Sequence, residues 1–181
     1  TEAMPHHWQK LRVEEMLLES GLPYTILQPA AYMQNVLAHW DQIVQEGTYP
    51  VPYPAETRLG MVDLKDVAEA AARILTQPGH ADAIYELAGP EVLSQSEIAL
   101  FLENRLGRPV RAQRVSLESW ESQARSSGLS GYQVDSLLKM FHHYERHGFW
   151  GNPSVLSWLL GRPATGFGVF CDRVVRERLA A

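Results

Sequence analysis

"HHWQKLRVEEMLLESGLPYTILQPAAYMQN" (residues 6–35) contains the pattern that decides the fold. Apolar residues spaced i, i+3, i+4 within 13–17, with a glycine and a proline just beyond, predict a helix over 6–20. "YTILQ" (24–28) is rich in β-branched and aromatic residues and stops at Pro29, which predicts a short buried strand. A helix that leads directly into a strand is typical of α/β proteins.

Working outward from this stretch, helical and extended segments alternate as far as residue 115, which indicates a mainly parallel sheet. Ser94 and Glu97 have the spacing of a capping box. We expect a helix over 31–46, a loop or ragged edge hairpin at 47–57, an extended piece at 59–63 and then a helix capped by Asp63. Strands at 83–89 and 110–115 should follow, with a helix between them. The rest of the chain should form helices near 117–127, 132–147, 154–160 and 167–179.

This pattern falls short of a complete doubly wound sheet. Only two strands, 24–28 and 83–87, are expected to be buried, and the glycine-rich turn that opens such sheets does not occur in the sequence.

Composition excludes some function classes. The chain has 181 residues, 45% hydrophobic and 20% charged, with a net charge of −5, so it offers no basic field for nucleic acid. No apolar run approaches the ~20 residues of a membrane span, and we expect no membrane association. A single cysteine, Cys171, cannot form an internal disulfide, so we expect a reducing, cytoplasmic location.

Four stretches together carry a resemblance to the NmrA-like family of atypical short-chain dehydrogenases/reductases, which includes NAD(P)H:quinone oxidoreductases and NADPH-sensing regulators. They occur in the family's order and are "HHWQKLRVEEMLLESGLPYTILQPAAYMQN", "MVDLKDVAEAAARIL", "YELAGPEVLSQSEIALFLENRLGRPV" and "LLGRPATGF".

The resemblance implies an α/β fold, namely the C-terminal part of a doubly wound Rossmann-type parallel sheet plus a mostly helical substrate-side lobe. Residues 1–115 would form the Rossmann-type part, with interleaved lobe segments, and residues 116–181 the helical lobe. The family's N-terminal half, with its glycine-rich βαβ part, has no counterpart here. NADP or NAD would therefore bind only if that half is supplied, and a second copy or a partner chain would cover the sheet edge.

The resemblance also assigns roles to six residues. Lys10 fits the lysine that holds the nicotinamide ribose, and His6 stands four residues before it, where typical members have the catalytic tyrosine. The resemblance places Pro29 and Ala30 against the nicotinamide ring, and Tyr32 and Asn35 in the substrate pocket. The alternatives are a solvated helix start for the first pair, and core packing or capping for the other four.

Other candidate residues are expected to be structural. Asp63 and Asp66 suit the start of a helix. His143 and His147 are spaced i, i+4 like a metal-binding pair, but no third ligand is evident, so we expect no metal. The aromatic residues between 132 and 150 would either pack between helices or accept a flat apolar ligand such as a quinone.

Three functions stay open at this point. One is an NAD(P)H-dependent quinone or carbonyl reductase. A second is a non-catalytic module that senses NADP(H) or binds a protein, and a third is a lobe that binds no nucleotide on its own.

Overall fold

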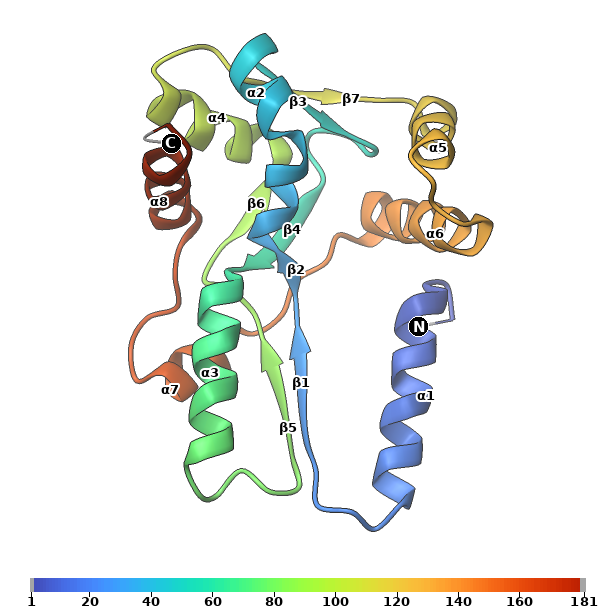
Figure 1. The fold of residues 1–181 in the computed structure, drawn as a ribbon, viewed down its shortest axis with the longest axis vertical. Coiled ribbons are helices and arrows are strands. Elements are labelled where there is room, and N and C mark those ends of the chain that lie inside the picture. Colours follow the sequence, from blue (N-terminus) through green and yellow to red (C-terminus); the bar gives the residue numbers. More distant parts are fainter. Residues whose placement is uncertain (1, 180–181) are drawn as a thin grey trace.

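The computed structural model describes residues 2–179 and is a mixed α/β fold of short parallel sheets and helices (Figure 1). In chain order the elements are α1 (Pro5–Glu19), β1 (Thr25–Pro29), β2 (Ala31–Tyr32), the 3₁₀ helix η1 (Met33–His39), α2 (Trp40–Glu46), β3 (Thr48–Val51), β4 (Arg58–Val62), α3 (Leu64–Thr76), β5 (Ala83–Leu87), β6 (Val92–Ser94), α4 (Gln95–Leu106), β7 (Arg111–Arg114), α5 (Leu117–Ser126), α6 (Gly131–His147), α7 (Pro153–Leu160) and α8 (Phe167–Leu179).

The strands form three small sheets. β1 pairs with β5 in parallel, with Thr25 opposite Ala83 and Pro29 opposite Leu87. β2, which follows β1 directly, belongs to a different sheet: it pairs in parallel with β4, and β4 pairs antiparallel with β6. β3 and β7 make a separate parallel pair. The mainly parallel α/β architecture predicted from the sequence is confirmed.

Most predicted elements are confirmed to within a few residues. Asp63 caps α3 by accepting from the Lys65 N–H, and Ser94 with Glu97 forms the predicted capping box of α4. Beyond α1, Gly21 has φ +70°, a left-handed conformation that glycine adopts without steric cost.

The predicted helix over 31–46 is wrong in its first half. Ala31 and Tyr32 are a strand, and 33–39 are a 3₁₀ helix. The reason is tertiary packing: Met33 and Val36 are both 1% exposed, and the three-residue repeat of a 3₁₀ helix turns both toward the core.

Two expectations for the strands also need correction. Residues 47–57 are neither all loop nor a hairpin, because Thr48–Val51 is a strand that pairs in parallel with β7. Pro50 is tolerated in this two-stranded sheet. The strand at 24–28 is only half-buried, and its partner β5 leaves Ile84 48% exposed. Among residues 2–179, β1 has no partner strand on its other edge.

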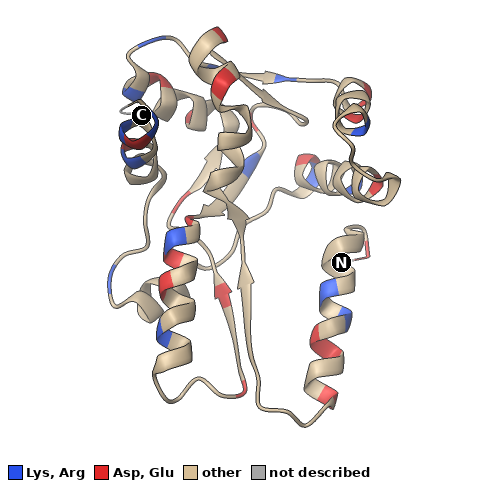
Figure 2. Ribbon diagram, viewed as in Figure 1, with Lys and Arg blue, Asp and Glu red and all other residues tan. Residues whose placement is uncertain are grey.

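The core has two parts. The larger lies among η1, α2, β3, β4, α4, α6 and α8, and the smaller joins the ends of β1, β4 and β5 to α3 and α7. Charged residues occur mainly in the helices, while the central strands β2 and β4 contain few (Figure 2). Among the described residues, no helix combines the length and apolarity needed to cross a bilayer.

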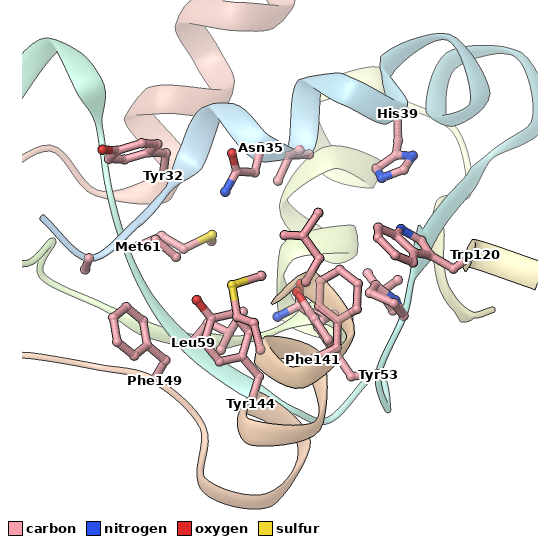
Figure 3. Close-up of a pocket in the computed structure, with 18 of the residues that line it drawn as sticks. Tyr32, Asn35, His39, Tyr53, Leu59, Met61, Trp120, Phe141, Tyr144 and Phe149 are labelled. Atoms are coloured by element: carbon pink, nitrogen blue, oxygen red, sulfur yellow. The ribbon is translucent and has the colours of Figure 1, made fainter. Parts of the chain in front are cut away.

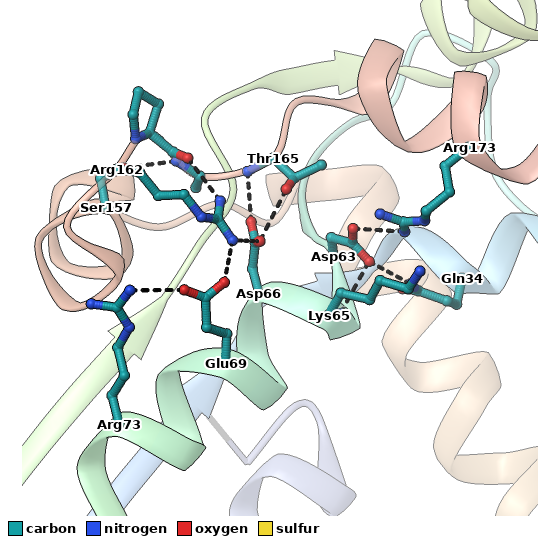
Figure 4. A network of polar contacts seen from close by, with 12 residues as sticks. Gln34, Asp63, Lys65, Asp66, Glu69, Arg73, Ser157, Arg162, Thr165 and Arg173 are labelled. Carbon is teal, nitrogen blue, oxygen red and sulfur yellow. Dashed lines mark hydrogen bonds and ion pairs between the residues drawn. The ribbon is translucent and has the colours of Figure 1, made fainter. Parts of the chain in front are cut away.

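Asp66 ties the segment before α8 to the start of α3 (Figure 4). It is 1% exposed and accepts from the Thr165 N–H at 2.6 Å, the Thr165 hydroxyl at 2.9 Å and Arg162 at 2.8 Å. Nearby, the fully buried Asp63 pairs with Arg173 at 2.7 Å and accepts from Gln34 Nε2 at 2.6 Å. Both aspartates are therefore structural, as expected from the sequence.

Candidate active site

A cavity of about 370 Å³ opens beyond the carboxyl ends of β1 and β2. Figure 3 shows its interior, where aromatic and apolar side chains from separate elements face one another. Ligands of open α/β sheets bind in the crevice at this end of the strands. Its lining includes all six residues singled out in the sequence, which are His6, Lys10, Pro29, Ala30, Tyr32 and Asn35.

A second cavity of about 350 Å³ lies beside the first, between α1 and the β1 strand. It is lined by Leu11 and Glu14 of α1, by Leu27 and Gln28 of β1, and by Trp150. The residues that line both cavities are His7, Lys10, Pro29, Ala30, Tyr32 and Phe149. The two cavities are thus neighbours that meet at Lys10 and the end of β1.

Helix α1 brings His6, His7 and Lys10 to this junction. Pro5 occupies its first turn, a favourable position for proline, and Met4 before it is buried at 4% exposure. Residues three and four apart lie on one helix face, so His6 and His7 both neighbour Lys10. Gln28 Nε2 donates to Glu14 Oε2 at 2.8 Å, which links α1 to β1.

The two histidines differ in what they face. His6 lines only the first cavity, and its Nδ1 is buried without a hydrogen-bond partner among the described residues. His7 lines both cavities and meets Phe149 edge to face, with ring centroids 5.7 Å apart. The His6 and His7 rings are themselves 4.4 Å apart. Sequence reasoning missed His7, although it stands three residues before Lys10, on the same face.

Electrostatics keeps both imidazoles neutral. Burial, followed by the positive charge of Lys10, lowers the pKa of His6. Burial lowers the pKa of His7 to about 4, with further contributions from His6 and Lys10. A neutral imidazole offers one N–H donor and one acceptor nitrogen at neutral pH.

Pro29 and Ala30 line both cavities. The Ala30 N–H donates to the Leu87 carbonyl at 2.9 Å, which continues the β1–β5 ladder past the end of β1. Leu87 is fully buried, so the core fixes the position of the backbone that pairs with Ala30. Tyr32 and Asn35 follow at the end of β2 and in η1, on the upper wall in Figure 3.

The opposite wall is aromatic and comes from α5, α6 and the segments after β3 and α6 (Figure 3). Trp120 meets Phe141 edge to face at 4.8 Å, and Tyr144 stacks on Phe149 at 5.4 Å. Of the aromatic residues noted between 132 and 150, Tyr132 lines neither cavity and is 60% exposed. Tyr53 and Trp120 were missed, because only the tertiary fold brings them here.

The histidines of α6 do not form a metal centre with other residues. The rings of His143 and His147 are 4.8 Å apart, but residues 2–179 contain no cluster of three or more His, Cys, Asp or Glu side chains that would hold a metal. Cys171 is buried and unpaired.

Known proteins resemble this chain in sequence over most of its length. The NAD(P)H azoreductase of Xenophilus azovorans is 30% identical over 157 residues, which cover 87% of this chain and 54% of the relative. Quinone oxidoreductase 2 of Escherichia coli strain K12 is 28% identical over 157 residues, with the same two shares covered. The chain therefore spans about half the length of the curated relatives it matches.

Solved structures show the same fold. The NADPH-dependent quinone oxidoreductase QOR2 of Escherichia coli superposes with a TM-score of 0.78 at 27% identity, over 91% of this chain and 59% of that one. The Citrobacter sp. triphenylmethane reductase complexed with NADP(H) has a TM-score of 0.75 at 21% identity, over 91% of this chain and 57% of that one, which is a likeness of fold alone. The model of the NmrA-like family matches residues 1–166, and the chain belongs to that family.

Proposed function

We propose that this chain forms the substrate side of an NAD(P)H-dependent reductase for flat conjugated acceptors, with quinones as the first substrate class to test. The observation that carries the proposal is that Lys10 and His7 line two adjoining cavities at the carboxyl end of β1. One cavity would hold the nicotinamide end of the cofactor and the other the acceptor. The quinone and azo relatives support the acceptor class.

The residues around the second cavity fit the nicotinamide end of NADP or NAD. Lys10 supplies an ammonium for the ribose hydroxyls, and the backbone of Pro29 and Ala30 offers a flat edge for the ring. When bound, the nicotinamide supplies the hydride. The sequence has no glycine-rich turn for the phosphates, so the described residues would hold only the nicotinamide end.

His7 and His6 would hydrogen-bond to the acceptor atom that receives a proton during reduction. His7 reaches both cavities, so its neutral N–H would donate a hydrogen bond to a carbonyl or azo atom beside Phe149. His6 lines the first cavity only and would support the same atom from the acceptor side. Burial, with a smaller contribution from the positive charge of Lys10, lowers the pKa of both rings and favours their neutral form.

The aromatic wall would bind the acceptor's ring and exclude water. Burial raises the pKa of Tyr144 to about 12, so its hydroxyl stays protonated and the wall stays uncharged. An uncharged aromatic slot favours flat apolar ligands, through face and edge contacts of the kind already present between Tyr144 and Phe149. Tyr32 and Asn35 would form the polar side of this slot.

The test is a titration of the chain with NADPH, followed by quinone-dependent NADPH oxidation. Lys10→Met should weaken NADPH binding by at least about tenfold, the equivalent of one charged hydrogen bond. Lys139→Met is the matched control, because Lys139 lies on α6, lines neither cavity, and among residues 2–179 pairs only with Asp135, at 2.8 Å. Binding without turnover would indicate an NADP(H) sensor instead. No binding at all would indicate a lobe that needs a further polypeptide.

The free edge of β1 leads to a proposal about partners. Within residues 2–179 one edge of β1 has no partner strand, and an unpaired edge offers free N–H and C=O groups, so a second copy or another polypeptide would cover it. A stable, strictly monomeric species in light scattering would contradict this.

We also propose that residues 1–115 act as the Rossmann-type part and residues 116–181 as the helical lobe. A reducing cytoplasmic location would suit the buried, unpaired thiol of Cys171.

A further inference from the structure

The first cavity has a second polar end, away from Lys10. Tyr32 and Phe149 lie at one end of the view in Figure 3, and His39 and Trp120 lie at the other. His39 ends η1, seven residues after Tyr32. With the ~2.0 Å rise per residue of a 3₁₀ helix, the two positions are about 14 Å apart along its axis. Tyr32 and His39 therefore mark two separate ends of the cavity.

The side chain of His39 makes no hydrogen bond with the part of the chain that the structure describes. Its ring lies against Tyr49, with centroids 6.2 Å apart, but the Tyr49 hydroxyl donates to Gln95 Oε1 at 3.1 Å. Within residues 2–179, neither ring nitrogen of His39 makes a hydrogen bond, and neither does the side chain of Asn35. Both side chains line the cavity, and Figure 3 shows them on its upper wall.

The chemistry of His39 suits recognition of a neutral polar group. Burial lowers its pKa, so the ring is neutral at pH 7 and offers one donor and one acceptor. A ligand that covers the ring without hydrogen-bonding to it would leave those groups without water, which weakens its binding. A ligand with a hydrogen-bonding substituent at the same place avoids that loss.

We propose that His39, assisted by Asn35, is a specificity-determining residue that selects elongated aromatic acceptors with a neutral hydrogen-bonding group at the end away from Lys10. This inference rests on the proposed function, because it takes the cavity to be the acceptor site. It narrows the substrate class from flat conjugated molecules to those that are polar at both ends.

The test measures binding of two matched dyes to the 181-residue chain by isothermal titration calorimetry. Para-carboxamidoazobenzene carries the polar end, and para-methylazobenzene has a similar shape without it. The unmodified chain should prefer the carboxamide by about tenfold, the effect of one satisfied buried hydrogen bond. His39→Phe should remove this preference by weakening only the carboxamide, while His39→Gln, which keeps a donor, should retain part of it.

The control is His142→Phe, which makes the same change on an exposed side chain of α6 and should leave both affinities unchanged. If His39→Phe does not fold, nitrogen NMR of the unmodified chain decides the matter, because the carboxamide should shift the ring nitrogens of His39. Equal binding of the two dyes, or a preference that survives His39→Phe, would overturn the inference while leaving the acceptor site intact. Failure of both dyes to bind would instead refute the acceptor site itself.

Discussion

His7 and Phe149 meet edge to face, with ring centroids 5.7 Å apart and an angle of 67° between the rings. This contact joins the first turn of α1 to the segment that follows α6, and both residues line both cavities. The contact with Phe149 therefore holds the neutral imidazole of His7 at the junction of the two cavities, where the proposed acceptor and nicotinamide would meet.

The depressed pKa of His7 makes the stability of the protein depend on pH. The ring has a pKa of about 4 when folded and 6.5 as a free side chain, so between these values the unfolded chain binds more protons. Stability from this group is fully present above pH 6.5 and is lost as pH falls toward 4. Urea unfolding at a series of pH values should show the loss. His7→Phe should flatten the curve relative to His142→Phe, and equal curves would contradict the assignment.

Removal of Asp63 should be strongly destabilising. Asp63→Ala leaves Arg173 without its buried partner and also removes the cap of α3, so we expect a loss of about 3–5 kcal/mol in the free energy of unfolding. Lys65→Ala breaks only the exposed 3.5 Å pair with Glu177 and should cost less than about 1 kcal/mol. Denaturant melts of the two variants measure the difference. Similar losses would mean that the Asp63 pair is not structural.

Gly89 should not tolerate a side chain. A Cβ at this position would lie 1.9 Å from the Met61 carbonyl oxygen, so Gly89→Ala forces the link after β5 away from β4. We expect a loss of about 1–3 kcal/mol or more, as for an overpacked core. Gly131→Ala is the control, because its Cβ would meet only Arg125 Nη1 at 3.9 Å, and it should change stability by no more than about 1 kcal/mol. Thermal unfolding compares the two.

Cys171 should be inert in the folded protein. It is 1% exposed, and burial raises the pKa of its thiol to about 12, so the reactive thiolate is scarce at neutral pH. An aromatic disulfide reagent should label it slowly in the native protein and rapidly after denaturation. Fast native labelling would show that α8 opens readily or that the thiol is accessible.

The sequence by itself determined most of the local elements and the family, but not the form of residues 31–39 or the strand at 48–51. The capping residues Asp63, Ser94 and Glu97 and the glycine after α1 act through neighbours in the chain, so their effect can be read from residue types and spacing. Lys10 and its helix face were predicted in the same way, with the resemblance supplying the role.

Only the tertiary structure decided which side chains share the cavities. The 3₁₀ form of residues 33–39 follows from the burial of Met33 and Val36, and it sets His39 on the cavity wall. Tyr53 and Trp120 come from loops and helices far along the chain from Lys10. Their proximity depends on long-range packing, which hydrophobic periodicity does not encode, because periodicity records which face is buried but not what it is buried against.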